Sequence, residues 1–332
     1  MNAHIARAGR AAESGKGISR QTALDLLQGE GDLPDIMYWA DRTRRAFHGD
    51  KVVFCAILSA RQGRCSEDCR FCAQSAHYPT ATAAHPLMDL DAMTRAAQAP
   101  HVAHCARFGL VTSGLGPKEG PEWERLLEAE RRIAKSGRCH ACAAFGKLTE
   151  KAARELVEAG VTRYNHNLET SRRFYPSVCT THTYDDRIET VRIAKAAGLA
   201  VCCGGIFGMG ETAEDRVDMA MDLRALNVDS IPINFLNPIP GTPFAGLPPL
   251  KPLECLRIVA VFRLMFPDKD IKLAGGRELR LRDLQSWMFY AGANSAILGN
   301  YLTTAGRRAE DDVRMVRDLS LRCVSGAEAL SP

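Results

Sequence analysis

The sequence lacks the features of a membrane or secreted protein. No apolar run in its 332 residues approaches the roughly 18 residues that a membrane-spanning helix needs. Residues 1–20 contain no apolar core of the kind that a secretory signal peptide carries. The formal net charge of +4 is small and evenly spread, which argues against a nucleic-acid partner. We therefore expect a cytoplasmic protein that binds neither a membrane nor nucleic acid.

The chain also lacks any linker, low-complexity tract or short-period repeat that would divide it into several domains. We expect three parts. Residues 1–48 form a partly helical N-terminal extension, of which residues 1–20 are disordered or loosely docked. Residues 49–320 form the main domain, and residues 321–332 form a loose C-terminal tail.

Apolar and β-branched runs alternate with amphipathic helical patterns, which is typical of βαβ units. The expected helices are Ser19–Leu27, Asp35–Phe47, Pro121–Gly137, Thr149–Gly160, Arg187–Ala197 and Thr212–Leu226. The expected strands are Val52–Leu58, Cys105–Thr112, Cys139–Phe145, Thr162–Glu169, Ala200–Phe207, Ser230–Phe235, Ile271–Ala274 and Asn294–Leu298. Eight such repeats predict an α/β fold, a closed (β/α)8 barrel of the TIM type with an N-terminal helical extension. A doubly wound open sheet is the alternative.

Twelve cysteines need an explanation. A cytoplasm keeps thiols reduced, so we expect most of the cysteines to be buried apolar residues and a minority to bind metal.

Cys65, Cys69 and Cys72 form a CxxxCxxC pattern just after Val52–Leu58. Thiolates favour zinc, copper(I) or iron–sulfur clusters. No second cysteine or histidine pair follows at the spacing of a structural zinc site, and only His77 is near. The pattern therefore favours a [4Fe–4S] cluster with one open iron, with zinc as the alternative.

Polar residues interrupt the expected fourth strand, near its carboxyl end. With the period-two alternation of a strand, Asn165, Asn167 and Glu169 share one face. Barrel enzymes build their sites at the carboxyl ends of the strands. Polar side chains that point into a barrel need hydrogen-bond partners, which a polar ligand can supply. We therefore predict a ligand site there.

Three further positions are candidates for ligand contact. Gly204 and Gly205 on the fifth strand allow close approach by a ligand, although the following GxGxE is no full dinucleotide fingerprint. Asn234 is a further inward polar residue, on the sixth strand. For Arg187 a ligand contact and a solvated surface charge both stay open.

Several stretches together resemble one family: SARQGRCSEDCRFCAQSAHY, YNHNLETS, CCGGIFGMGET, SIPINFLNPIPGTP and AGGRE…MFYAGANS. They are similar to the biotin synthases, which are radical S-adenosylmethionine enzymes. The resemblance implies a barrel enzyme that inserts sulfur into dethiobiotin to make biotin. It implies that the cysteine triad holds a [4Fe–4S] cluster that binds and cleaves S-adenosylmethionine, and that an auxiliary cluster donates the sulfur. A related radical enzyme with another substrate and a non-catalytic metal-binding scaffold are the alternatives.

The resemblance also assigns residues and partners. Asn167 and Glu169 match positions near S-adenosylmethionine and substrate, Asn234 matches one that contacts the ureido ring, and Phe71 matches an aromatic beside the adenine. We place Asn165, Arg187, Gly204 and Gly205 among the cofactor-binding residues as well. A homodimer and a low-potential reductant, flavodoxin or ferredoxin, are implied in the same way.

The auxiliary site departs from the family pattern. The family binds a [2Fe–2S] cluster with three cysteines and an arginine, and the matching residues here are Gly109, Cys142, Cys202 and Lys272. Side chains of one barrel layer come from alternate strands, so Cys55 on the first strand belongs with Cys142, Cys202 and Lys272. Cys139 and Cys203 should face away. We expect a variant cluster, with two or four irons, held by Cys55, Cys142 and Cys202. The alternative is that Cys55 is a buried apolar residue.

Overall fold

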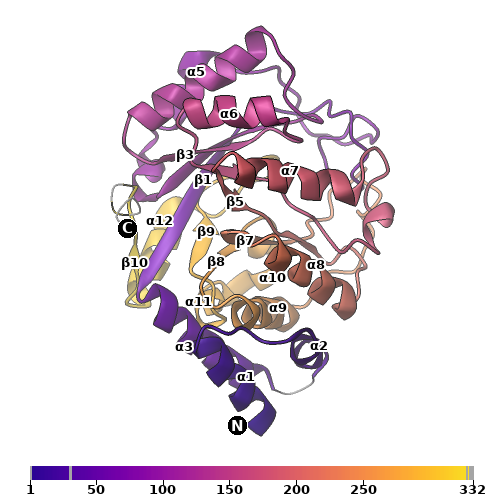
Figure 1. Cartoon of the computed structure of the whole chain (residues 1–332), viewed down its shortest axis with the longest axis vertical. Coiled ribbons are helices and arrows are strands. Elements are labelled where there is room, and N and C mark those ends of the chain that lie inside the picture. The colour runs from indigo at the N-terminus through magenta and orange to yellow at the C-terminus, as the bar shows by residue number, and fades with distance from the viewer. Residues whose placement is uncertain (1, 30–31, 327, 329–332) are drawn as a thin grey trace.

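Figure 1 shows the computed structural model of the chain, which describes residues 2–29, 32–326 and 328. Parallel strands form a closed barrel, because β9 pairs with β1 and completes the ring. The expected (β/α)8 barrel is confirmed, and the open sheet is excluded. The strands are β1 (Lys51–Arg61), β2 (Arg107–Thr112), β3 (His140–Ala144), β4 (Arg163–Asn165), β5 (Ala200–Cys202), β6 (Gly205–Phe207), β7 (Ser230–Phe235), β8 (Asp270–Leu273) and β9 (Ser295–Ile297).

The fifth position of the barrel holds two short strands instead of the one expected over Ala200–Phe207. Both β5 and β6 pair with β7, but β5 does so only at Cys202 and β6 only from Gly205 onward. The gap faces Pro232, which has no N–H to donate to a ladder. A Cβ atom at Gly204 would lie 2.1 Å from the Pro232 carbonyl oxygen, so the two backbone segments are too close there for any side chain at position 204.

The fourth strand is shorter than expected and ends at Asn165, not at Glu169. Glu169 has a φ of +70°, which no strand residue adopts, and its backbone bridges to Gly205. Extended pairing nevertheless continues to Leu168, because the His166 N–H donates to Cys202 O (3.0 Å) and the Leu168 N–H donates to Gly204 O (3.0 Å). Strand alternation therefore holds up to Leu168, and the backbone changes direction only at Glu169.

Helices lie outside the strands (Figure 1), and Thr-x-x-Asp capping boxes start two of them, at Thr183–Asp186 and Thr212–Asp215. The first of these boxes explains why α7 starts three residues before the expected Arg187. The helices after β1 are α4 (Leu90–Ala96), α5 (Pro121–Lys135), α6 (Glu150–Glu158), α7 (Tyr184–Ala196), α8 (Ala213–Ala225), α9 (Pro252–Met265), α10 (Arg277–Leu281), α11 (Trp287–Tyr290) and α12 (Ala309–Asp318).

The N-terminal segment is ordered, so our expectation of a disordered or loosely docked start is wrong for the described residues 2–20. Three helices, α1 (Ala3–Glu13), α2 (Arg20–Gln28) and α3 (Leu33–His48), gather at one end of the molecule beside α9 (Figure 1). Ile5 and Ala12 of α1 are buried. Gly9 packs so closely on Trp39 that an added Cβ would lie 2.0 Å from its ring. Small and apolar residues at helical spacing thus bury one face of α1.

The C-terminal segment is also partly ordered. Its strand β10 (Arg322–Cys323) pairs with β1 at Lys51 and Val52, so the expectation of a loose tail from residue 321 is wrong for these two residues. Residues 327 and 329–332 of that predicted tail lie outside the described residues. Within the described part of the chain, no helix combines the length and apolarity needed to cross a bilayer.

Candidate active site

A cavity of about 470 Å³ occupies the barrel lumen. Its walls come from every strand position of the barrel and from the loops that follow β1, β2, β3, β4, β7, β8 and β9. Because those loops leave the carboxyl ends of the strands, the cavity opens at the face where barrel enzymes place their sites.

The cysteine triad lies on the loop that follows β1, and all three residues border the cavity. Backbone hydrogen bonds close the loop: the Cys65 N–H donates to Gln74 O (2.9 Å) and the Cys72 N–H donates to Cys69 O (2.9 Å). Burial raises the pKa of Cys72 to about 11. A metal must therefore displace a thiol proton when it binds there. The triad fits a group that is ligated by thiolates and still open toward the cavity.

The polar residues at the end of β4 and just after it border the cavity. Asn165, Asn167 and Glu169 all border it. Asn167 is held on both sides, because its Oδ1 accepts from the Gly204 N–H (3.2 Å) and its Nδ2 donates to Glu169 Oε2 (3.4 Å). Burial raises the pKa of the Glu169 carboxyl above its ordinary value, against the opposing charge of Arg187. All three side chains border the lumen as expected; strand alternation accounts for Asn165 and Asn167, whereas Glu169 lies at the turn that follows.

Arg187 is buried at the cavity wall, so the surface-charge interpretation is wrong. Its Nε donates to Tyr175 Oη (2.6 Å) and its Nη1 donates to the Asn167 carbonyl oxygen (2.9 Å). The same Nη1 lies 3.6 Å from Glu169 Oε1. Arg187 therefore fixes the segment after β4 and supplies a positive charge to this wall of the cavity.

Phe71 and Asn234 also border the cavity. Asn234 Nδ2 donates to Gly205 O (3.1 Å) and its Oδ1 accepts from the Gly275 N–H (2.9 Å), so its amide connects β6 to the loop after β8.

Gly204 and Gly205 are not among the residues that line the cavity. A Cβ at Gly205 would lie 2.5 Å from Met219 Sδ. The close approach at these glycines is thus to neighbouring protein atoms, contrary to the expected approach by a ligand.

Deeper in the lumen, Cys55, Cys142, Cys202 and Lys272 border the same cavity, together with Gly109. The Lys272 ammonium donates to Cys202 Sγ at 3.4 Å. Burial acts to lower the pKa of Lys272, but the sulfurs of Cys202 and Cys55 outweigh it and raise that pKa above its ordinary value. These side chains from alternate strands therefore lie along one cavity, as the sequence predicts. Two other cysteines, Cys139 and Cys203, are absent from the cavity wall, as their odd spacing predicts.

The sequence reasoning missed two arginines beside this layer, Arg107 on β2 and Arg163 on β4. Among the described residues, the buried Arg107 Nε and Arg163 Nε have no hydrogen-bond partner, and Arg163 Nη1 has an ion pair with Asp270 Oδ2 at 3.6 Å but no hydrogen bond. Buried donors of this kind need an acceptor, so the layer fits an anionic group. Arg107 stands two residues before Gly109 and therefore shares its face, a signal that was present in the sequence.

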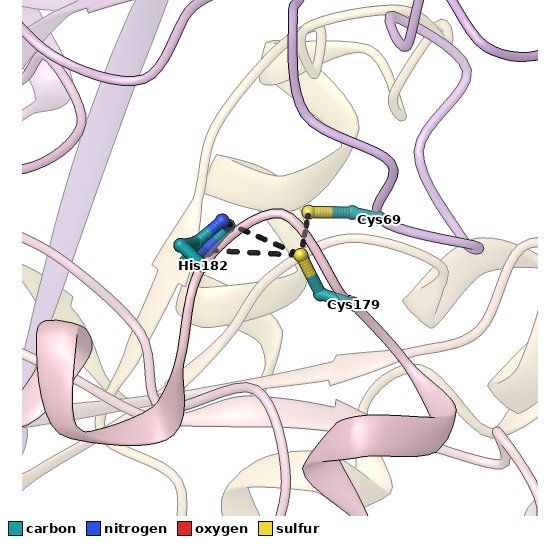
Figure 2. Close-up of side chains that lie close together, drawn as sticks. All are labelled: Cys69, Cys179 and His182. Carbon is teal, nitrogen blue, oxygen red and sulfur yellow. Dashed lines mark hydrogen bonds between the residues drawn. The ribbon is translucent and has the colours of Figure 1, made fainter.

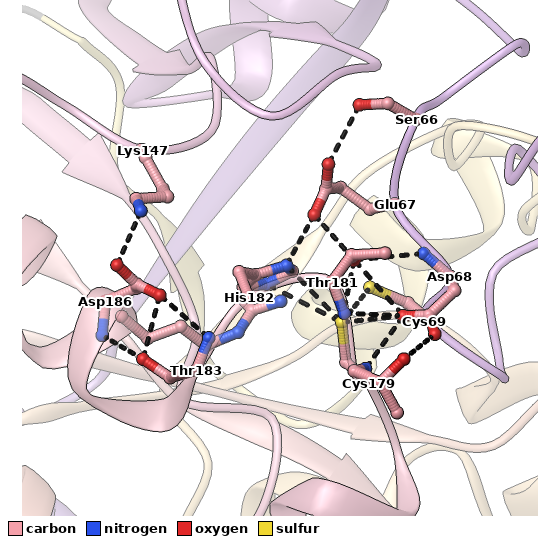
Figure 3. A network of polar contacts seen from close by, with 12 residues as sticks. Ser66, Glu67, Asp68, Cys69, Lys147, Cys179, Thr181, His182, Thr183 and Asp186 are labelled. Atoms are coloured by element: carbon pink, nitrogen blue, oxygen red, sulfur yellow. Dashed lines mark hydrogen bonds and ion pairs between the residues drawn. The ribbon is translucent and has the colours of Figure 1, made fainter.

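The sequence reasoning also missed a cluster that touches the triad (Figure 2). Cys179 Sγ lies 3.7 Å from Cys69 Sγ and 3.3 Å from His182 Nδ1. The His182 ring contacts Glu67 Oε2 at 2.7 Å. Cys179 and His182 lie between the short helix Tyr175–Ser177 and α7, on a loop that hydrogen bonds join to the triad loop (Figure 3). The motif Cys-Thr-Thr-His, with cysteine and histidine three residues apart, is the signal that could have found it.

Two family models match the chain. Residues 60–223 match the radical SAM superfamily, and residues 232–322 match the biotin and thiamin synthesis associated domain. Together they span the barrel from the end of β1 to β10.

Three curated relatives share the name biotin synthase. A protein of Geobacter sulfurreducens named biotin synthase is 51% identical over 310 residues, which are 92% of this chain and 94% of the relative. A biotin synthase of Heliobacterium modesticaldum is 50% identical over 93% of this chain and 94% of its own length. One of Geotalea daltonii is 46% identical over 99% of this chain and 100% of its own length.

Solved structures of lower identity share the fold. The chain is similar to methylornithine synthase, with a TM-score of 0.83 at 19% identity over 97% of this chain and 98% of that one. It is also similar to a maturase of the [FeFe]-hydrogenase, with a TM-score of 0.81 at 16% identity over 96% of this chain and 75% of that one. These two similarities concern the barrel architecture alone.

Proposed function

This chain belongs to the biotin synthase family of radical S-adenosylmethionine sulfurtransferases, and we propose that its lumen cavity holds dethiobiotin between two iron–sulfur sites. The observation that carries the proposal is the position of six cysteines along one cavity. Cys65, Cys69 and Cys72 border it at the loop after β1, and Cys55, Cys142 and Cys202 border it deeper in the barrel.

The triad at the loop after β1 would hold the [4Fe–4S] cluster. When bound, that cluster supplies the electron that cleaves S-adenosylmethionine into methionine and a 5′-deoxyadenosyl radical. The chain positions the reactants and limits the access of water. Phe71, half-buried in the triad loop, is suitably placed to pack against the adenine.

The wall after β4 would bind S-adenosylmethionine and the polar part of the substrate. Asn167 and Glu169 offer an amide and a carboxylate at the cavity, and Arg187 keeps both in place. Asn165 lies on the same wall, with its Nδ2 donating to the Ala143 carbonyl oxygen (3.3 Å). Asn234 uses one amide hydrogen and one lone pair internally, which leaves one of each for the ureido ring of dethiobiotin.

The deeper layer would hold the auxiliary cluster through Cys55, Cys142 and Cys202. Gly109 offers no side chain, and an ammonium such as that of Lys272 cannot ligate iron because it has no free lone pair. Arg107 and Arg163 border the same cavity, and their Nε groups, which have no hydrogen-bond partner, would donate to the anionic sulfides of a cluster. Lys272 would add a neighbouring positive charge.

The test is a single-turnover assay with the anaerobically reconstituted chain. The protein is given S-adenosylmethionine, dithionite and dethiobiotin, and the products are measured with total iron and sulfide. Biotin formed with methionine and 5′-deoxyadenosine supports the proposal. Cleavage of S-adenosylmethionine without biotin would favour a related enzyme with another substrate, and zinc without sulfide would favour a non-catalytic scaffold.

The remaining assignments rest on the family resemblance. We propose a homodimer, a flavodoxin or ferredoxin as the physiological reductant, and a cytoplasmic location. We also propose residues 49–320 as the catalytic unit, with residues 1–48 as an extension packed on it. Sedimentation velocity tests the dimer, and reduction of the cluster by purified flavodoxin and its reductase tests the electron donor.

A further inference from the structure

Three metal-ligating side chains converge at the edge of the triad loop. The ligand atoms of Cys69, Cys179 and His182 all lie within 4.8 Å of one another, and no other such group is found among the described residues. Cys69 and Cys179 are buried, and 7% of the His182 side chain is exposed. Cys69 and His182 border the lumen cavity, so an ion can reach them from it.

The distances suit one tetrahedral ion. Zinc binds sulfur at about 2.3 Å and imidazole nitrogen at about 2.0 Å, so tetrahedral angles place two sulfurs about 3.8 Å apart and a sulfur and a nitrogen about 3.5 Å apart. Here the two sulfurs are 3.7 Å apart, and Cys179 Sγ lies 3.3 Å from His182 Nδ1 and 3.9 Å from Nε2. The distances from Cys179 Sγ to the other two ligands thus lie within about 0.4 Å of the tetrahedral values, and Cys69 Sγ lies within 4.8 Å of a His182 ring nitrogen.

The surroundings orient the ligands before any ion arrives. Glu67 Oε2 contacts His182 Nδ1 at 2.7 Å, so it can accept the Nδ1 proton and leave Nε2 free for a metal. This carboxylate–histidine arrangement is the usual support of a metal-bound imidazole. Thr181 Oγ1 donates to Glu67 Oε2 (2.7 Å), and the Thr180 N–H donates to Asp68 Oδ1 (2.8 Å). Hydrogen bonds thus hold the Cys179 loop against the triad loop (Figure 3).

We propose that the cluster-free chain binds one Zn²⁺ ion through Cys69, Cys179 and His182, with Glu67 orienting the imidazole and the fourth position open to water. Two thiolates and an imidazole are a soft donor set that suits this ion. Cys69 is shared with the triad, so the zinc ion and the [4Fe–4S] cluster exclude one another. That exclusion rests on the proposed function, whereas zinc binding does not.

Binding is tested on the full-length, cluster-free, reduced chain in anaerobic buffer. Co²⁺ serves as the spectroscopic probe, and Zn²⁺ affinity is measured against a chromophoric chelator. We expect one tetrahedral cobalt ion with thiolate charge-transfer bands. Cys179→Ser should roughly halve the charge-transfer intensity, and both Cys179→Ser and His182→Gln should weaken Zn²⁺ binding at least tenfold. Glu67→Gln should weaken it about 10- to 100-fold, as for other residues that support a ligand.

Cys65→Ser is the matched control, because it removes a triad thiol that lies outside the proposed zinc site. It should leave the cobalt spectrum and the Zn²⁺ affinity unchanged. A loss of affinity in Cys65→Ser without a loss in Cys179→Ser would place the ion in the triad and overturn the proposal. Unchanged affinity in His182→Gln would overturn it as well, and this variant decides the matter if Cys179→Ser does not fold.

The exclusion is tested by cluster reconstitution. One equivalent of Zn²⁺ should slow assembly of the triad cluster in the parent chain but not in Cys179→Ser. Equal slowing in both proteins would overturn the exclusion. If the parent forms no cluster even without zinc, the proposed function fails while the zinc result stands.

Discussion

The Lys272 ammonium lies 3.4 Å from the Cys202 sulfur inside the closed barrel. This contact places a buried positive charge beside a thiol, at the position where the family pattern has an arginine. Gly109, at the position of a family cysteine, borders the same cavity without a side chain to bind metal. The auxiliary cluster that we propose would therefore rely on other thiols, and Cys55 borders the cavity beside Cys142 and Cys202.

Cys55→Ser should remove the auxiliary cluster and leave the triad cluster in place. We expect iron and sulfide to fall by the content of one cluster and biotin formation to cease. Release of 5′-deoxyadenosine should continue, because the triad is untouched. Mössbauer spectra of ⁵⁷Fe-reconstituted protein measure the change. Cys203→Ser is the control, since Cys203 is buried beside Cys202 but lies off the cavity wall. An auxiliary signal that persists in Cys55→Ser would remove Cys55 from the ligand set.

Cys69→Ala should abolish cleavage of S-adenosylmethionine with little effect on the fold. The residue lies on a loop beyond β1 and takes no part in the barrel ladder. The measurement is 5′-deoxyadenosine release, followed with the thermal midpoint of the cluster-free protein. Cys323→Ala on β10, outside the cavity wall, should keep the parent rate. Parent-level release from Cys69→Ala would refute the cluster assignment.

Asn167→Ala and Glu169→Gln should weaken ligand binding more than they weaken the fold. Loss of one hydrogen bond to a charged or strongly polar ligand costs roughly 1.5–3 kcal/mol, or about ten- to a hundredfold in affinity. Equilibrium binding of S-adenosylmethionine and dethiobiotin measures the effect, and urea unfolding measures stability. Glu158→Gln, on the exposed side of α6, is the matched control. Unchanged affinity for both ligands in both variants would contradict the proposed roles.

His48 should make the fold less stable in mild acid. Burial and the Arg263 guanidinium, whose Nη1 lies 3.1 Å from His48 Nε2, lower the pKa of His48 from 6.5 to about 4. Between these values the unfolded chain binds more protons than the folded chain, so the free energy of unfolding falls as the pH falls through this window. From pH 7 to pH 5 the loss from this residue is roughly 2 kcal/mol.

Urea unfolding of the cluster-free protein at pH 7 and pH 5 measures this fall in the free energy of unfolding. His48→Gln should reduce the fall by roughly 2 kcal/mol. His104→Gln, at an exposed position, should leave the fall as in the parent. An identical pH dependence in the parent and in His48→Gln would show that the ring is protonated as easily in the folded chain as in the unfolded one.

Local patterns were enough to predict the barrel. The alternation of apolar runs with amphipathic helices placed all eight strand positions, and the odd and even spacing of cysteines separated Cys142 from Cys139 and Cys202 from Cys203. These features depend on residues a few positions apart, whose geometry the period of a strand or helix fixes. The same reasoning failed for the first helix, where a face of small residues, Ala8, Gly9 and Ala12, gave too weak an apolar signal to predict packing.

The sequence by itself also determined the chemistry of the triad, because three thiols on one loop need no distant partner to bind a metal. Only the tertiary structure decided which residues from distant parts of the chain contact the triad and the cavity wall. Cys179 contacts Cys69 across 110 positions of the chain, and the buried Arg187 donates to the Asn167 carbonyl oxygen across 20 positions. Such contacts depend on how the barrel closes and on the path of its loops, and no local period of the sequence encodes either of these.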